Sequence, residues 1–282
     1  MDVPLLAEDL APGDRHHAAG DFGDVRVRRV CDPDDVDFAV AYSQLFGEFG
    51  WRGEMERRQV ICERLAWDPA RPVTRAALAY EMLTLRRGGE IAALRDHTAA
   101  VRLDDDGRPL PGPIVVHLSH ALVHPPHRGS GLAAWLRALP LQTARRCAAS
   151  AGCAAGTPVV LVAEMEPRDE HQPARMARLR SYERAGFQLI DPSAAPYAQP
   201  DFGAPDTWEG AAPRAISLGL VVRRVGREGE STMPPDELRA VVEAVYAVYG
   251  VHVPAAALDP LRADAARYTS RPGPIPLLPP TA

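Results

Sequence analysis

The spacing of apolar residues predicts strands and helices that alternate along most of the chain. Runs in which apolar residues are continuous or alternate with polar ones predict strands at 25–30, 76–85, 90–103, 114–123, 158–165, 187–190 and 214–225. Runs in which apolar residues recur every three or four positions predict helices at 36–49, 54–67, 132–147, 174–185, 236–249 and 255–268. Pro140 falls inside the third helix and should kink it, because proline removes one backbone hydrogen bond. The order of these elements favours a mixed α/β fold.

Composition divides the chain into three parts. Residues 1–22 are rich in Asp, Pro and Gly, which predicts a flexible N-terminal tail. Residues 23–226 carry the predicted strands and should form the main domain. Residues 227–282 should add a helical extension that ends in a mobile Pro-rich tail from Ser270. Within the main domain, 191–212 is a long loop, and loops of this length often act as lids or binding loops.

The composition also argues against several classes of function. The chain has 46% hydrophobic residues, enough to bury a core, and its net charge of −5 argues against a nucleic-acid partner. All 32 basic residues are arginine, so a catalytic lysine is excluded. The four cysteines form no Cys-x-x-Cys pair and indicate reduced thiols in a cytoplasmic protein. There is no apolar leader and no run of membrane-spanning length, so we expect no membrane partner.

A Gly-rich stretch between the strand at 114–123 and the helix at 132–147 has the features of a phosphate-binding loop. The first N–H groups of a helix lack carbonyl partners, and the helix dipole favours an anion beside them. Glycines let the backbone approach a phosphate closely, and an arginine adds a planar positive charge suited to phosphate oxygens. The stretch consists of Arg128, Gly129, Ser130, Gly131, Leu132 and Ala133.

Two motifs along the chain resemble those of one enzyme family. Arg128, Gly131 and Ala133, preceded by Val123-His124-Pro125, match the pattern Gln/Arg-x-x-Gly-x-Gly/Ala. About one strand and one helix later, Tyr182-Glu183-Arg184-Ala185-Gly186-Phe187 has a tyrosine four positions before a Gly-Phe pair. Together and in this order, the motifs resemble the acetyl-CoA loop and the late tyrosine motif of the GNAT family of N-acyltransferases.

This resemblance implies a fold, a cosubstrate and a reaction. The fold would be a mostly antiparallel sheet with a parallel split at its centre and helices on both faces. The reaction would transfer an acetyl or other short acyl group from acetyl-CoA to a primary amine of a small molecule or peptide by direct attack. Backbone groups of Ala121, Leu122 and Val123 would pair with the pantetheine arm, and those of 129–133 would bind the pyrophosphate. Dimers are common in the family, so a homodimer is an expected partner.

The resemblance also implies catalytic residues. Tyr182 matches the family's late tyrosine, and a phenol can protonate a departing thiolate; the alternative is a tyrosine that only packs its helix on the sheet. Family members can carry a general base on the strand before the loop, where His117 is the nearest match and an imidazole has a suitable pKa. His120 is the alternative if a bulge shifts the register. Glu164, or Glu166, could act through a water molecule or attract a cationic amine, and a structural role for each stays open.

Two other classes of function fit part of the sequence. Gly129, Gly131 and Ala134 also match the dinucleotide fingerprint Gly-x-Gly-x-x-Gly/Ala of NAD-binding oxidoreductases. That motif normally opens the first strand–helix unit and needs an acidic residue about twenty positions later. The stretch 148–155 has no acidic residue. A non-catalytic acyl-CoA-binding or regulatory module is the second alternative, because a fold does not determine a function.

Four histidines around the predicted loop raise the question of a metal site. They are His117, His120, His124 and His127. Their spacing does not match a common zinc pattern, and strand alternation sends them to opposite faces, so we expect no metal. The neighbouring Asp96 and His97 should also point to opposite faces of their strand, so they are not expected to act as a pair.

Overall fold

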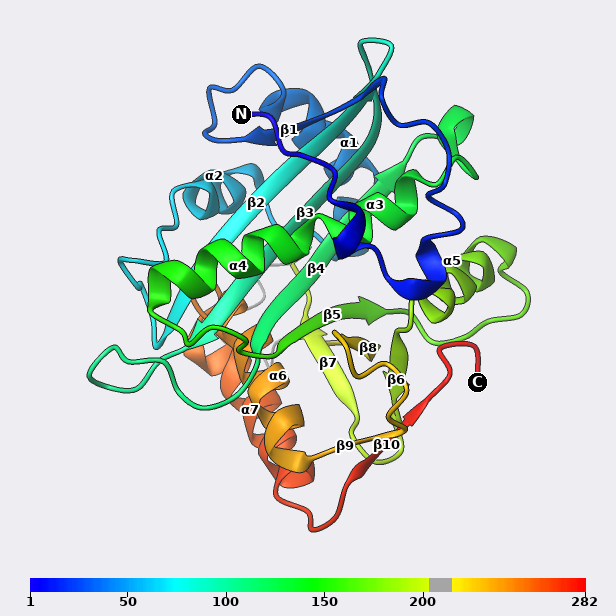
Figure 1. The fold of residues 1–282 in the computed structure, drawn as a ribbon. Helices are drawn as coiled ribbons and strands as arrows, with labels where there is room; N and C mark the ends of the chain where they lie inside the picture. The colour runs from blue at the N-terminus through cyan, green and yellow to red at the C-terminus, as the bar shows by residue number, and fades with distance from the viewer. Residues whose placement is uncertain (203–214) are drawn as a thin grey trace.

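The computed structural model describes residues 1–202 and 215–282. In this part of the chain, ten strands form a sheet in the order β1-β2-β3-β4-β5-β8-β6-β10-β9, and β7 pairs with β8 beside this path (Figure 1). The strand pairs run antiparallel except for β4 and β5, which are parallel. The strands are β1 (Val25–Val30), β2 (Ala76–Arg87), β3 (Glu90–Arg102), β4 (Ile114–Val123), β5 (Val159–Met165), β6 (Gln188–Ile190), β7 (Tyr197–Pro200), β8 (Ala215–Arg224), β9 (Thr232–Met233) and β10 (Ile275–Leu278). The predicted mixed sheet, mostly antiparallel with a parallel pair, is confirmed.

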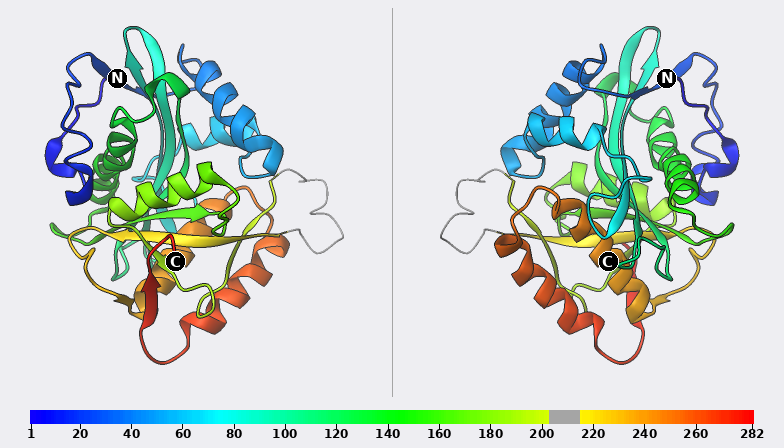
Figure 2. Two further views of the ribbon diagram at one scale, coloured as in Figure 1. Left: turned by 90° about the vertical axis from the view of Figure 1, so that its right-hand side faces the viewer. Right: turned by 90° about the vertical axis from the view of Figure 1, so that its left-hand side faces the viewer.

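Helices cover both faces of this sheet (Figures 1 and 2). On one face, Leu83 and Leu85 of β2 pack with residues of α3, and α4 and α5 lie on the same face. On the other face, Tyr80 and Met82 of β2 pack with residues of α1 and α2, and α6 covers the lower part of the sheet. The helices are α1 (Phe38–Phe49), α2 (Arg58–Leu65), α3 (Leu132–Ala138), α4 (Pro140–Ala151), α5 (Pro173–Arg184), α6 (Pro235–Tyr249) and α7 (Ala255–Thr269). The alternation of buried residues along the strands therefore supplies two cores, one on each face.

Proline divides one predicted helix. The helix predicted at 132–147 becomes α3 and α4, with Leu139 between them and Pro140 as the first residue of α4. The predicted kink is confirmed, because the proline has no N–H to continue the ladder of α3. The helix predicted at 54–67 is shorter, since α2 begins at Arg58, and Glu54 lies in irregular backbone before it.

Residues 1–22 are not a loose tail. They include the short helical turns η1 (Ala7–Asp9) and η2 (Pro12–Asp14) and pack along α3 and α4. Asp9 is buried and binds Arg145 of α4 through two hydrogen bonds. Asp14 is buried and binds Arg137 of α3 in the same way. The composition of this segment predicted a flexible tail. Its buried aspartates are instead counter-ions of arginines far away in the sequence.

The C-terminal region is not an appendage. Helix α6 packs against β2, β3 and β4, and its apolar residues share a core with β5 and β8. The segment after Ser270, predicted to be mobile, forms β10, which pairs with β6 on one side and β9 on the other. Ile275 and Leu277 are buried, and Pro276 between them is exposed. This alternation of buried and exposed residues is typical of a strand, although it lies in a Pro-rich stretch.

The long loop predicted at 191–212 is in part a strand, since β7 pairs with β8 over Tyr197–Pro200. Residues 203–212 of this prediction lie outside the described residues. No helix in the described part of the chain is long and apolar enough to cross a membrane.

Candidate active site

The centre of the sheet opens where β4 and β5 separate. Their parallel ladder runs from the pair Ile114–Val159 to the pair His117–Val162, and the described pairing ends there. Strand β4 continues to Val123, so its later backbone groups on the β5 side face no strand partner among residues 1–202 and 215–282. A cavity of about 440 Å³ lies at this split. The cavity is a candidate ligand site, because the backbone groups of β4 beside it have no strand partner in the described part of the chain.

Both faces of the sheet contribute side chains to the cavity. The face that carries α3 and α5 contributes Arg95, Ala133, Leu136, Arg137, Ser181 and Tyr182. The face that carries α1 and α6 contributes Phe49, Glu54, His117, His120 and Tyr249. The split therefore connects the two sides of the sheet, and two ligands could meet there from opposite directions.

A bulge in β4 brings two predicted catalytic histidines to the same face. His120 is opposite Asp96 of β3, and His117 is opposite Thr98, so two residues of β4 face one residue of β3. The ring of His117 packs edge-to-face on a tyrosine of α6, and the ring of His120 packs on a phenylalanine of α1. The expectation that strand alternation separates them is wrong, because an inserted residue reverses the alternation after it.

His117 is held by a buried carboxylate. Its Nε2 atom lies 2.9 Å from Oε2 of Glu164, and the hydroxyls of Tyr197 and Tyr249 also donate to this carboxylate. Burial would raise the pKa of Glu164, but His117 and the two hydroxyls lower it below its usual value. A hydrogen bond to this carboxylate requires a proton on Nε2 of His117, because a carboxylate oxygen can only accept. Its Nδ1 atom, 3.5 Å from Oγ of Ser119, is then the nitrogen that can accept a proton.

His120 is placed in the cavity wall as a cation. Its Nδ1 atom lies 2.9 Å from Oδ1 of Asp96, and its Nε2 atom lies 3.0 Å from the carbonyl oxygen of Glu54. Burial alone would lower the pKa of His120, but the Asp96 carboxylate raises it to about 9. Both ring nitrogens thus carry protons at neutral pH and both donate to oxygen. This argues against His120 as the general base, although the bulge on which that alternative depended is present.

Tyr182 of α5 lines the cavity from the opposite face. Its hydroxyl accepts a hydrogen bond from Nη2 of Arg95 at 3.3 Å, and its ring packs edge-to-face on Phe187. The guanidinium of Arg137 lies 5.6 Å from the centre of the ring. Gly186, with φ of 77°, ends the helix and returns the chain to β6. The Tyr-x-x-x-Gly-Phe motif thus places a buried phenol at the cavity, and its hydroxyl hydrogen has no acceptor among the residues that the structure describes.

The predicted phosphate loop is only partly at the cavity. Gly129 and Gly131 have positive φ angles of 75° and 89°, as a tight Gly-rich turn requires. Nε of Arg128 donates to the carbonyl oxygen of Val123 at 3.2 Å. The predicted cofactor-binding residues that line the cavity are Ala121, Leu122, Val123, Arg128 and Ala133. Those that do not line it are Gly129, Ser130, Gly131 and Leu132.

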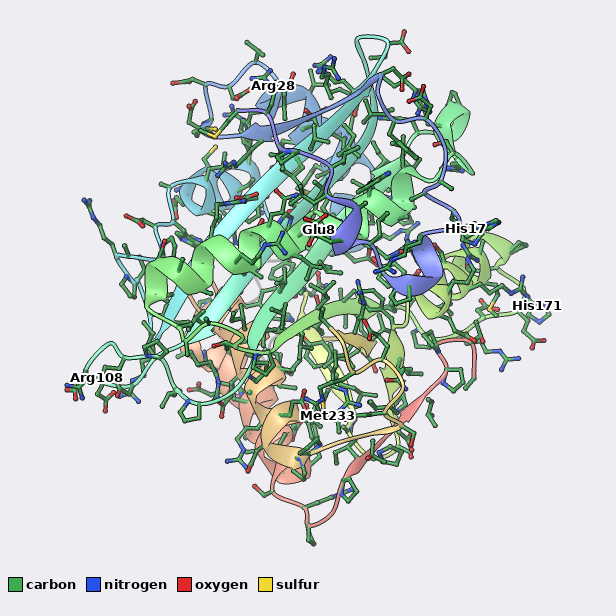
Figure 3. All side chains as sticks on the ribbon, viewed as in Figure 1. Glu8, His17, Arg28, Arg108, His171 and Met233 are labelled. Atoms are coloured by element: carbon green, nitrogen blue, oxygen red, sulfur yellow. The ribbon has the colours of Figure 1, made fainter. Side chains whose placement is uncertain are left out.

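The N-terminal segment packs directly on this loop (Figure 3). A Cβ atom on Gly131 would lie 2.4 Å from the carbonyl oxygen of His17 and 3.0 Å from the ring of Phe22. That ring in turn packs edge-to-face on Trp135 of α3. Close packing therefore accounts for a glycine at position 131 without any phosphate.

Glu54 and Arg95 line the cavity but were not predicted from the sequence. In the described residues, the Glu54 carboxylate makes no hydrogen bond or ion pair, and burial raises its pKa above the usual value. The sequence pattern predicts a helix at 54–67, and no local feature distinguishes Glu54 there as a residue of a functional site. Arg95 lies within an apolar strand pattern, and only its position beside Tyr182 in the folded chain identifies it. In residues 1–202 and 215–282, no three His, Cys, Asp or Glu side chains lie close enough to hold a metal ion.

No family model and no curated protein matches the chain. Solved structures that resemble it include a GNAT family acetyltransferase from Elizabethkingia anophelis with acetyl-CoA bound, at 12% identity and a TM-score of 0.36, covering 71% of this chain and 98% of that one. An acyl-CoA N-acyltransferase from Pseudomonas aeruginosa matches at 19% identity and a TM-score of 0.34, covering 70% and 99%. A GNAT family acetyltransferase from Streptococcus pneumoniae matches at 16% identity and a TM-score of 0.34, covering 71% and 98%. The structures from Elizabethkingia anophelis and Streptococcus pneumoniae carry the name of the GNAT family, whose motifs the two motifs of this sequence resemble.

Proposed function

We propose that this chain is an acyl-CoA-dependent N-acyltransferase that moves a short acyl group, most simply acetyl, to a primary amine by direct attack. One observation carries the proposal. The cavity at the β4–β5 split joins a face with a buried phenol, Tyr182, to a face with a carboxylate-held imidazole, His117. An acyl transfer needs a proton donor for the departing thiolate and a proton acceptor for the attacking amine, on opposite sides of the reacting carbonyl.

The acyl donor belongs on the side of α3 and α5. The backbone groups of β4 that face no strand partner can pair with the amides of a pantetheine arm, as a third strand would. Arg128, at the end of the cavity nearest the Gly-rich loop, can bind a phosphate of the CoA. An N–H group of the open part of β4 can polarise the thioester carbonyl. Tyr182 gives its proton to sulfur as the C–S bond breaks.

The amine belongs on the side of α1 and α6. Glu54 offers a carboxylate without an ionic partner in the described residues, and it would attract the ammonium form of the acceptor. His117, held by Glu164 through Nε2, would accept the proton at Nδ1 before or during attack. Phe49 and Tyr249 give this side an apolar wall, which suits an amine on an apolar body.

The test is release of free CoA from acetyl-CoA in the presence of a panel of primary amines. We expect turnover with at least one amine. We also expect kcat to fall about 100-fold or more in Tyr182→Phe and in His117→Ala, because each variant removes a group that moves a proton. Tyr268→Phe and His171→Ala are matched controls away from the cavity and should retain the activity of the wild type.

Three results would contradict the proposal. Binding of acetyl-CoA without turnover on any amine would favour a non-catalytic acyl-CoA-binding module. Binding of NADH in place of acetyl-CoA would favour the dinucleotide alternative. Full activity of both Tyr182→Phe and His117→Ala would show that the roles given to these residues are wrong.

A further inference from the structure

Arg95 is a buried arginine without a carboxylate partner among residues 1–202 and 215–282. It lies in the middle of β3, on the face that carries α3 and α5, and is 1% exposed. The described part of the chain has four other buried arginines, and each binds a carboxylate. These pairs are Arg64–Glu56, Arg137–Asp14, Arg223–Glu228 and Arg224–Glu230. Arg95 therefore differs from the other buried arginines of the described chain, since each of those forms an ion pair with a carboxylate.

The one hydrogen bond described for the Arg95 side chain goes to Tyr182. Its Nη2 atom donates to the tyrosine hydroxyl at 3.3 Å, and its Nε and Nη1 atoms are buried without a partner in the described residues. A guanidinium keeps its charge at any pH that proteins tolerate, so the charge cannot be removed by loss of a proton. A buried charge without a counter-ion destabilises the fold. Its presence beside the cavity suggests that a negative charge develops there during function.

The bond between the two side chains also orients the phenol. Arg95 can only donate, so it occupies a lone pair of the Tyr182 oxygen. The hydroxyl hydrogen has no acceptor among the described residues, and both side chains line the cavity. The hydrogen is therefore available to a group inside the cavity.

From these contacts we infer that Arg95 is a positioning residue for Tyr182. It holds the phenol with its hydrogen toward the cavity and stabilises the phenolate that remains after proton transfer. This role rests on the proposed function. As the C–S bond breaks, its electron pair stays on sulfur and the phenol proton moves to sulfur, which yields free CoA and a phenolate next to Arg95. The nitrogen–carbon bond of the amide forms as the C–S bond breaks. An acceptor bound as its ammonium gives two protons to solvent by way of His117, one before attack and one as the amide forms. The phenolate regains one proton from solvent before the next turnover, so each turnover releases one net proton.

A double-mutant cycle between Arg95→Met and Tyr182→Phe tests the inference. Arg95→Met should lower kcat about as much as Tyr182→Phe does, and KM for acetyl-CoA should stay within about threefold of the wild type. The double variant should be no slower than either single variant, because Arg95 acts only through the phenol. Arg95→Lys, which keeps a positive charge, should recover part of kcat.

A structural role would give a different pattern. Arg223→Met removes a buried arginine that pairs with Glu228, so it should lower the melting temperature and its effect on kcat should multiply with that of Tyr182→Phe. Arg95→Met should not lower the melting temperature, because it removes an unpaired buried charge. The inference is wrong if the two effects multiply in the cycle, or if Arg95→Met raises KM and leaves kcat unchanged. If the wild type transfers no acyl group to any amine, the proposed function and this inference both fail.

Discussion

His120 and Asp96 form a buried pair in the wall of the cavity, and the protonation of both groups follows from their contact. Burial alone would raise the pKa of Asp96, but His120 and the hydroxyl of Tyr80 lower it to about 2. The same contact raises the pKa of His120 to about 9. The pair is therefore charged on both sides over the whole neutral range, and it fixes the bulge in β4 against β3.

This pair predicts how stability depends on pH. The folded pKa of His120 lies above its usual value of 6.5, so its contribution is full below pH 6.5 and is lost as pH rises through about 9. The folded pKa of Asp96 lies below its usual value of 3.8, so its contribution is full above pH 3.8 and is lost as pH falls toward 2. His120→Gln should lower the free energy of unfolding by about 3–5 kcal/mol at pH 5 to 6, because it leaves a buried carboxylate unpaired.

Urea unfolding of the wild type and of His120→Gln between pH 5 and 9.5 measures this difference. The difference in the free energy of unfolding between the two forms should become smaller as pH rises above 6.5. His171→Gln, at an exposed position, should show no such trend. A constant difference across this range would mean that His120 is not charged in the folded protein.

The sequence predicts some of the residues at the cavity and not others, for physical reasons. Tyr182 lies four positions before Gly186, and a glycine at this place is typical of the residue that ends a helix. The bulge in β4 leaves no mark in a pattern of period two, so the common face of His117 and His120 could not be predicted. Glu54 and Arg95 are ordinary charged residues in the sequence, and only their neighbours in the folded chain distinguish them.

The element with the largest difference between prediction and structure is the N-terminal segment, 1–22. Asp14 and Arg137 are separated by 123 positions, and no local pattern can show that they pair. The carboxylate accepts hydrogen bonds of 3.0 and 2.7 Å from the guanidinium, and both side chains are buried. The segment thus completes one face of the sheet beside α3, close to the loop that was predicted to bind phosphate.

Removing this pair should destabilise the fold. Asp14→Asn leaves the buried guanidinium of Arg137 without its counter-ion, which should cost about 3–5 kcal/mol of unfolding free energy. Asp105→Asn is a matched control, because Asp105 pairs with Arg75 at a site where both side chains are more than 75% exposed. Its cost should be below about 1 kcal/mol. Equal losses in the two variants, measured by urea unfolding, would show that residues 1–22 do not hold α3 in solution.

Strands and helices with strong apolar patterns were predicted within a few residues, because burial on one or both faces leaves a regular trace in the sequence. The structures of segments with mixed composition were not predicted correctly. Strand β10 lies in a Pro-rich stretch, and its two buried residues are too few to stand out from a disordered tail. The burial of such a segment depends on partners that local composition does not report.

At the scale of the whole molecule, the sheet separates two kinds of chemistry and the split between β4 and β5 joins them. The side of α3 and α5 carries Arg95 and Tyr182, and Arg128 lines the same cavity; in the proposed function these residues suit a donor with phosphates and a leaving thiolate. The side of α1 and α6 carries Glu54 and His117, which suit an amine. The mostly antiparallel order provides the rigid frame, and its parallel pair provides the opening.

The measurement that tests this assignment most directly is calorimetric titration with acetyl-CoA, and separately with NADH, on three forms of the protein. Ala177 lies on the exposed surface of α5 and lines the cavity, so Ala177→Trp should fill the donor side without disturbing a core. Arg180→Trp places the same side chain on an exposed part of α5 that does not line the cavity. We expect acetyl-CoA to bind the wild type and Arg180→Trp with one site per chain, binding to be lost in Ala177→Trp, and NADH not to bind. Binding of NADH, or unchanged binding of acetyl-CoA to Ala177→Trp, would contradict the placement of an acyl-CoA at the β4–β5 split.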